Sequence, residues 1–167
     1  MKNLALGREF IISSIDGQKK VSGKKFLSAQ SESDNEWNSI DSTINRAHQH
    51  AAGARKGEEI AIGRSKGGLT TKVHMVADAH GNPREFVITE GQVHDMKEAV
   101  TLAETSDAEA FLGDKGYDSE PLREMLLKKG ILPVIPRKKN SSKPNPSFDR
   151  ELYKARHTVE NLFAKMK

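Results

Sequence analysis

Hydrophobic residues in the first half of the chain recur in short runs, which predict strands. Around Trp37 the segment EWNSIDSTI predicts a strand whose apolar members are Trp37, Ile40 and Ile44. A second run, LTTKVHMVAD at 69–78, is followed by the turn residues HGNP and a third run, REFVITE at 84–90. The two later runs and their turn predict a β-hairpin.

The second half of the chain predicts helices that alternate with strands. A helix is expected from Asp95 to about Glu104, with Asp95 as its N-cap and Glu98 completing a capping box. Either Asp118 or Ser119 caps the next helix, and Lys-Lys-Gly at 128–130 closes it.

Two apolar runs flank this second helix and predict short strands. The run AFL at 110–112 stops at Gly113-Asp114, and ILPVIP at 131–136 leads into a basic, proline-rich loop at 137–149. Asp114 therefore lies at the C-terminal end of its strand. That is the edge at which ligands and catalytic groups gather in α/β sheets.

The last part of the chain, residues 151–167, predicts one helix because it contains no glycine or proline. At about 100° per residue, four polar residues fall within roughly 60° of one another: Tyr153, Arg156, Glu160 and Lys167. An apolar stripe runs beside them: Leu152, Val159, Phe163 and Met166. The polar row therefore borders the buried face. An amphipathic surface helix with ordinary Glu–Arg pairing is the alternative interpretation.

Residues 46–68 have no regular period and predict a long loop, which in a compact domain is usually functional or mobile. Its basic side chains suit DNA phosphates, although a solvated basic loop would have the same composition: Arg46, Arg55, Lys56, Arg64 and Lys66. His48 and His50 alternate in this loop, but no third ligand has zinc-like spacing. A zinc site is therefore not expected.

The composition adds limits to this picture. The chain has 167 residues, 35% of them hydrophobic and 30% charged, and suits one domain with a small appendage. It has no cysteine, no apolar run near 18 residues and no signal-like N-terminus, so we expect a cytoplasmic protein without a membrane span. A net charge of +4 permits nucleic acid as a partner. Residues 1–36 show no sustained period, and the regular domain is expected at 37–167.

The predicted order of elements is that of an α/β, ribonuclease-H-like fold with a mixed sheet. In such a fold the first strand, the end of the fourth strand and the last helix meet on one side of the sheet, which brings together Asp41, Asp114 and Glu160. Clustered carboxylates repel one another unless cations hold them, and their hard oxygen ligands suit Mg²⁺ or Mn²⁺. Asp41 could instead be a carboxylate on an edge strand that faces water.

Several motifs in this order resemble the DDE transposases of bacterial insertion sequences, in the IS-four/IS-five group and closest to the IS-five family. The motifs are IDSTINRAHQHAAGA at 40–54, GRSKGGLTTKVHMVADAHGNP at 63–83, GQVHD at 91–95 and LGDKGYD at 112–118. The final helix matches the group's Y-x2-R-x3-E-x6-K signature at all four positions named above.

The resemblance implies that Asp41, Asp114 and Glu160 are the catalytic acids and hold Mg²⁺ or Mn²⁺, as two ions. It also implies that Arg156 and Lys167 contact DNA phosphates and that Tyr153 orients or packs beside them. The implied reaction is cleavage of double-stranded DNA at the terminal inverted repeats, followed by strand transfer into target DNA. The implied assembly is a homo-oligomer, or the product of a partner reading frame.

Two departures from the family pattern shape the expectations. Residues 1–36 match the family's N-terminal DNA-binding region poorly, and the signature helix stops at Lys167, so a truncated or second-frame product is expected. A non-catalytic DNA-binding remnant that inhibits a full-length transposase is therefore one alternative function. An unrelated Mg²⁺-dependent phosphohydrolase, with Asp114 as its nucleophile, is another.

Overall fold

The computed structural model describes residues 35–48, 61–146 and 148–166. Several sequence-based expectations lie outside these residues: those for the segment 1–34, His50, Arg55, Lys56 and Lys167. Within the described residues, no helix is both long enough and apolar enough to cross a membrane.

A six-stranded mixed sheet forms the centre of the described chain. Its strands are β1 (Trp37–Arg46), β2 (Gly63–Ser65), β3 (Gly68–Ala77), β4 (Pro83–Glu90), β5 (Ala110–Leu112) and β6 (Leu132–Val134). The order is β2-β3-β1-β5-β6, and β4 also pairs with β3. β3 is antiparallel to β1, β2 and β4, whereas β5 is parallel to both β1 and β6. The predicted strands and hairpin are therefore confirmed.

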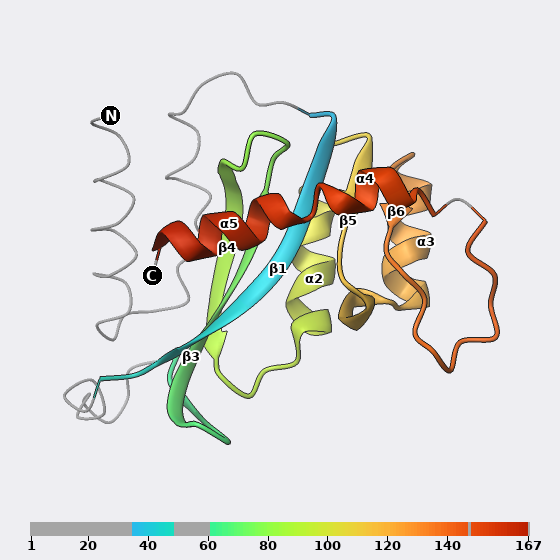
Figure 1. Ribbon diagram of the computed structural model, residues 1–167. Helices are drawn as coiled ribbons and strands as arrows, with labels where there is room; N and C mark the ends of the chain where they lie inside the picture. The colour runs from blue at the N-terminus through green and yellow to red at the C-terminus, as the bar shows by residue number, and fades with distance from the viewer. Residues whose placement is uncertain (1–34, 49–60, 147, 167) are drawn as a thin grey trace.

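Helices cover both faces of this sheet. They are α2 (Asp95–Glu104), the 3₁₀ helix η4 (Lys115–Tyr117), α3 (Glu120–Lys128), α4 (Arg150–Lys154) and α5 (His157–Met166). Figure 1 shows α4 and α5 lying across one face, with α2 and α3 behind the other. The molecule thus has three layers, and each helical layer buries the apolar side chains of one face of the sheet.

The alternation of side chains along each strand divides the core between the two faces. On the α2 and α3 face, Ile40 and Phe111 pack with Leu102, Leu122 and Leu126. The opposite face has two clusters. α5 packs Val159 and Phe163 against β3 and β4, and α4 packs Leu152 and Tyr153 beside Trp37, Leu112 and Val134.

The prediction of a single helix at 151–167 is wrong in one respect, because a turn at Ala155 and Arg156 separates α4 from α5. The Arg156 N–H donates to Tyr153 O at 3.1 Å, and Thr158 N–H donates to Ala155 O at 3.0 Å. Such bonds to the third residue back tighten a helical turn. α4 packs over β5 and β6 while α5 packs over β3 and β4, so the two helices cover different parts of the sheet.

Two further expectations are corrected. The loop predicted at 46–68 ends early, since β2 and β3 form a hairpin in which Arg64 lies on β2 and Lys66 lies in the turn. Ile44 was expected to be an apolar member of the first strand but is 51% exposed. It lies beyond Ser39, the last β1 residue that pairs with β5, in the part of β1 that extends past the helices (Figure 1).

The N-cap of α3 provides a first prediction. Ser119 is the cap: its hydroxyl accepts a hydrogen bond from Leu122 N–H, so the alternative cap, Asp118, is excluded. We expect Ser119→Ala to lower the free energy of unfolding by about 1 kcal/mol, the usual cost of losing such a cap. Ser119→Asp should retain most of the stability. Urea denaturation of the three proteins measures the difference, and equal loss in both variants would contradict the capping role.

Candidate active site

The pairing of two parallel strands brings the first two predicted acids to the same part of the sheet. Ser39 of β1 pairs with Leu112 of β5; Asp41 lies two residues further along β1, and Asp114 lies two residues past Leu112, where β5 has ended. Because side chains alternate along a strand, both acids point to the face that α4 and α5 cover. β1 lies between β3 and β5, but β5 pairs with it only as far as Ser39, so at Asp41 the strand pairs, among the described strands, with β3 alone. The Asp41 side chain is 25% exposed and contacts Arg156, whereas the alternative interpretation has it facing water.

Asp114 is held by the turn that follows β5. It is the N-cap of η4, and its Oδ1 accepts a hydrogen bond from Gly116 N–H at 2.8 Å. A Cβ at position 116 would lie 2.8 Å from the same oxygen, so a side chain there would displace the carboxylate from this position. The sequence Asp-Lys-Gly therefore fixes the carboxylate at the strand end, where it is half-buried.

Arg156 joins the last helix to the sheet. Its Nη1 lies 3.4 Å from Asp41 Oδ2, and its Nη2 donates to Glu160 Oε1 one turn along. The ring of Tyr153 lies under the guanidinium, with 6.0 Å from Cζ to the ring centroid. Of the expected row, Arg156 contacts both Asp41 and Glu160 and Tyr153 lies against Arg156, although the helix is broken within the row.

The three carboxylates share one electrostatic environment. Burial raises the pKa of Asp41, and the negative charges of Asp114 and Glu160 raise it further. The Ser42 N–H, which donates to Asp41 Oδ1 at 2.8 Å, and the Arg156 guanidinium act in the opposite direction. The net rise means that Asp41 retains its proton more readily than an isolated aspartate, and a cation placed here would be stabilising.

The carboxylates of the three acids have the chemistry that suits a hard divalent cation, but they are too far apart in this structure to bind one together. Asp41, Asp114 and Glu160 offer only carboxylate oxygens, which suit Mg²⁺ or Mn²⁺. Across residues 35–48, 61–146 and 148–166, however, no three His, Asp or Glu side chains are grouped closely enough to hold a metal. Arg156 supplies the positive charge between Asp41 and Glu160. Joint binding of a metal by all three acids would require Arg156 to move.

Asp95 lies close to this site, contrary to its expected role as a helix cap. His94 is the N-cap of α2, with its Nδ1 accepting from Met96 N–H, and Asp95 is the first helical residue. The Asp95 carboxylate turns toward the sheet, where Oδ1 accepts from Ser42 Oγ at 2.9 Å and from Lys72 Nζ at 3.1 Å. The sequence signal was the pair of polar residues at 72 and 74, which face one side of an otherwise apolar strand.

His74, the other polar residue of that pair, is fully buried and neutral. Burial lowers its pKa to about 4, with a further reduction from Lys72 and a partial reversal by Asp95. An unfolded histidine binds a proton near pH 6.5, so the native state loses stability as the pH falls from about 6.5 toward 4 and loses none above that window.

This titration gives a second prediction. Between pH 7 and pH 5, we expect the wild type to lose about 2 kcal/mol more unfolding free energy than His74→Gln, which cannot titrate. Glutamine retains an amide that can bond to Thr89 Oγ1, the partner of His74 Nε2. Denaturant titrations of both proteins at the two pH values measure the difference. Parallel pH dependence in the two proteins would contradict a buried neutral His74.

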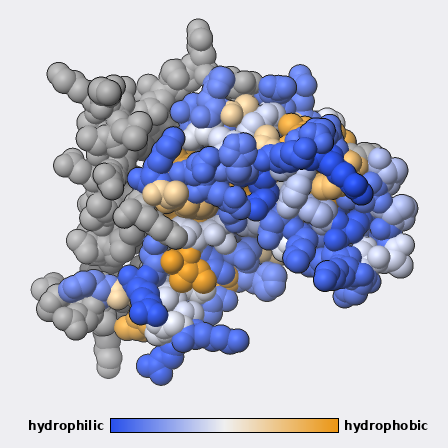
Figure 2. Space-filling model, in the orientation of Figure 1, coloured by the Kyte–Doolittle hydropathy of each residue, from blue (hydrophilic) through white to orange (hydrophobic). Residues whose placement is uncertain are grey.

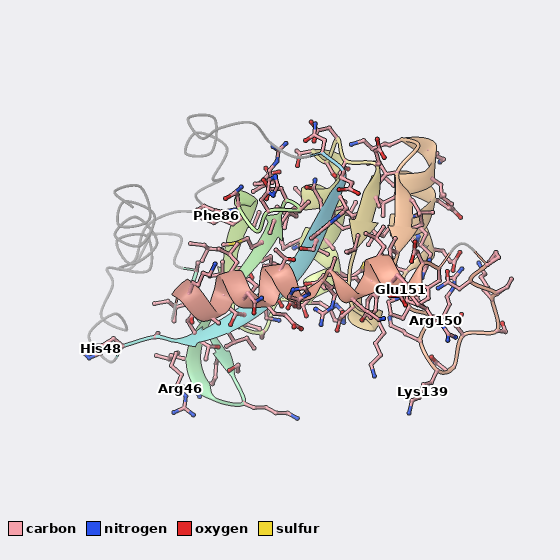
Figure 3. The ribbon with its side chains drawn as sticks, turned by 45° about the horizontal axis from the view of Figure 1, so that its top comes forward. Arg46, His48, Phe86, Lys139, Arg150 and Glu151 are labelled. Atoms are coloured by element: carbon pink, nitrogen blue, oxygen red, sulfur yellow. The ribbon has the colours of Figure 1, made fainter. Side chains whose placement is uncertain are left out.

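The structure does not bring the predicted phosphate contacts of the basic loop to the three acids. Arg46 pairs with Thr70, and Arg64 pairs with Leu69, at the opposite end of β3 from Ala77. Arg46 is five residues beyond Asp41 on an extended strand, which is roughly 17 Å. Figure 3 shows Arg46 and His48 at the free end of β1 and Lys139 in the loop that precedes α4. Arg46, Arg64 and Lys66 are exposed.

The space-filling view shows mainly hydrophilic side chains over α4, α5 and the preceding loop (Figure 2). A mixed sheet covered by helices on both faces, with one acid within β1, one just past the end of β5 and a Glu–Arg pair at the last helix, is consistent with an α/β transposase core. The comparisons with known proteins agree. The model of the family described as transposase DDE domain matches residues 36–167, so the chain belongs to the transposase DDE domain family.

One relative and two solved structures are similar to the chain. A putative transposase for insertion sequence element IS6501 from Brucella ovis is 32% identical over 101 residues, which cover 59% of this chain and 77% of the relative. A Mos1 transposase paired-end complex with left transposon end matches 95% of this chain and 59% of its own, with a TM-score of 0.40 and 10% identity. A piggyBac transposase synaptic complex with hairpin DNA matches 66% of this chain and 24% of its own, with a TM-score of 0.38 and 14% identity.

Proposed function

We propose that the chain is the catalytic part of an insertion-sequence transposase of the IS-four/IS-five group, with a ribonuclease-H-like core at 37–167. Its reaction is metal-dependent cleavage of double-stranded DNA at the terminal inverted repeats, followed by transfer of the freed 3′ end into target DNA. The observation that carries the proposal is the gathering of the three acids: Arg156 contacts both Asp41 and Glu160, and the charges of Asp114 and Glu160 act on Asp41. Family membership and the insertion-sequence relative support the same assignment.

In this mechanism Asp41, Asp114 and Glu160 hold Mg²⁺ or Mn²⁺, as two ions. Bound divalent ions activate the attacking oxygen and stabilise the leaving oxygen in phosphodiester chemistry. β1 holds Asp41 and the start of η4 holds Asp114, which limits how far the two aspartates can move. Glu160 completes the set from α5.

Arg156 has a second role in this proposal. Its guanidinium bridges Asp41 and Glu160, and it would be available to a DNA phosphate if bound cations neutralised these acids in its place. Tyr153 lies against the guanidinium and limits where it can turn. Lys167, Arg46, Arg64 and Lys66 are proposed as further phosphate contacts, and a homo-oligomer or a partner reading-frame product brings two DNA ends together.

The test is Mg²⁺-dependent nicking of a duplex that carries the terminal inverted repeat of the element encoding the chain. We expect the wild type to nick this DNA with Mg²⁺ and not with a chelator, and Glu160→Gln to be slower by roughly a hundredfold or more, equivalent to about 3 kcal/mol. Glu151→Gln is the matched control. Glu151 is an exposed glutamate on α4 that pairs only with Lys154 in the contacts described (Figure 3).

The outcomes separate the proposal from its alternatives. DNA binding without nicking in any of the three proteins would indicate a non-catalytic DNA-binding remnant. Hydrolysis of small phosphate esters that survives Glu160→Gln would indicate a phosphohydrolase that uses Asp114 without the helix. Equal nicking by Glu160→Gln and Glu151→Gln would contradict the role of Glu160.

A further inference from the structure

A polar network lies beneath β1 on the face opposite the three acids. The Asp95 carboxylate, at the start of α2, accepts hydrogen bonds from Ser42 Oγ at 2.9 Å and Lys72 Nζ at 3.1 Å. Lys72 is largely buried and also donates to Val93 O at 2.8 Å, which holds the chain just before α2. His74 Nδ1 lies 3.6 Å from the same Asp95 oxygen.

Two buried side chains border this carboxylate, His74 and Tyr117, which are 0% and 2% exposed. Among the described residues His74 Nδ1 has no hydrogen-bond partner, whereas the Tyr117 phenol interacts with the Ser42 side chain. Burial, together with the charges of Asp95, Asp41 and Asp114, raises the pKa of Tyr117 above its usual range, so the phenol keeps its proton. An orphaned buried polar group is costly, and it usually persists in a site whose arrangement serves a function.

Ser42 connects this network to the acid site. Its hydroxyl is bound by Asp95 on one face of β1, while its backbone N–H donates to Asp41 Oδ1 at 2.8 Å. β5 pairs with β1 only as far as Ser39, so among the described residues no strand pairs with that side of β1 at Asp41 and Ser42. The hydrogen bond between Ser42 and Asp95 is therefore a side-chain contact that connects this stretch of β1 to α2.

We infer that Asp95 is a positioning residue for the reaction proposed above: through Ser42 it fixes the backbone that orients the Asp41 carboxylate. Lys72 anchors Asp95 and balances its charge. Asp95 does not touch the substrate or the metal in this arrangement and acts only through Ser42. The inference rests on the proposed function, because it assumes that Asp41 is a metal ligand.

Direct binding of Mn²⁺ to the full chain, measured by isothermal titration calorimetry without DNA, tests the inference. We expect Ser42→Ala and Asp95→Asn each to weaken Mn²⁺ binding by about tenfold or more, as loss of a group that orients a metal ligand does. Ser42→Thr keeps the hydroxyl and should bind as the wild type does. Asp41→Asn should lose the binding.

Ser106→Ala is the matched control for a purely structural effect. The Ser106 hydroxyl accepts a buried hydrogen bond from Asn38, at the other end of β1, so its loss should lower the melting temperature about as much as Ser42→Ala. Its Mn²⁺ affinity should remain that of the wild type. Ser42→Ala is informative even if Asp95→Asn fails to fold with Lys72 unpaired, because it leaves the Lys72–Asp95 pair in place.

The outcomes for this inference differ from those for the proposed function. If Asp41→Asn loses Mn²⁺ binding while Ser42→Ala and Asp95→Asn bind as tightly as the wild type, the role of Asp95 is overturned and the proposed function stands. A wild-type chain that neither binds Mn²⁺ nor nicks DNA would overturn the proposed function and the role of Asp95 with it.

Discussion

Asp41→Asn and Asp114→Asn should each abolish Mg²⁺-dependent DNA cleavage while the chain remains folded. Each change removes one anionic oxygen ligand and leaves a side chain of almost the same size. In metal-free buffer the loss of one of several clustered negative charges should leave stability unchanged or raise it by about 1 kcal/mol. The rise should be clearer for Asp41, because its pKa is already raised by burial and by Asp114 and Glu160.

Cleavage assays and thermal unfolding on the same preparations measure both parts of this prediction. Asp107→Asn is the control, because Asp107 is an exposed aspartate that bonds to Arg84 and Asn35. It should cleave DNA at the wild-type rate. A large fall in melting temperature for both Asp41→Asn and Asp114→Asn would show that these acids are structural instead.

The largest loss of stability is expected at Arg123. Its guanidinium is 6% exposed and donates to Asp118 Oδ1 at 2.9 Å, to Ile135 O at 2.6 Å and to Asn145 Oδ1 at 3.3 Å. Asp118 is equally buried and also bonds to Arg137 and to Lys138 N–H. Arg123→Met would leave the Asp118 carboxylate without its closest cation. We expect a loss of about 3–5 kcal/mol in unfolding free energy.

The pH dependence of this network has a definite sign. Burial alone would raise the pKa of Asp118, but the Lys138 N–H, Arg123 and Arg137 outweigh it and lower the pKa. The stabilisation is therefore present above the pKa of an unfolded aspartate and is lost as the pH falls through the lower folded value. Arg84→Met removes a more exposed pair with Asp107 and should cost at most about 1 kcal/mol. Denaturant titration that finds equal costs for Arg123→Met and Arg84→Met would contradict the burial argument.

Short-range sequence patterns predicted most of the scaffold. The alternating runs gave β1, β3 and β4, and the strand that stops at Gly113-Asp114 placed Asp114 correctly, because a Gly-Asp step both ends a strand and caps a turn. The helical spacing of Arg156 and Glu160 predicted their pairing, which the structure has. These features depend on neighbours within a few residues, so a single sequence contains the information.

Features set by contacts distant in sequence were not predictable in the same way. Asp95 fits a local capping pattern, but its carboxylate binds Ser42, 53 residues earlier, and Lys72. The break between α4 and α5 has no glycine or proline to mark it, and the two helices pack on different strands of the sheet. The exposure of Ile44 depends on where β5 ends, which the residues around Ile44 cannot indicate.

The central claim is that Asp41, Asp114 and Glu160 together form one binding site for divalent cations. Fe²⁺ bound in place of Mg²⁺ generates hydroxyl radicals with ascorbate and peroxide, and these radicals cut the peptide chain close to the metal. The proposed site predicts cuts beside all three acids, on β1, after β5 and on α5, and suppression of the cuts by excess Mg²⁺. A chain that nicks DNA but is cut at none of these three positions would contradict the claim.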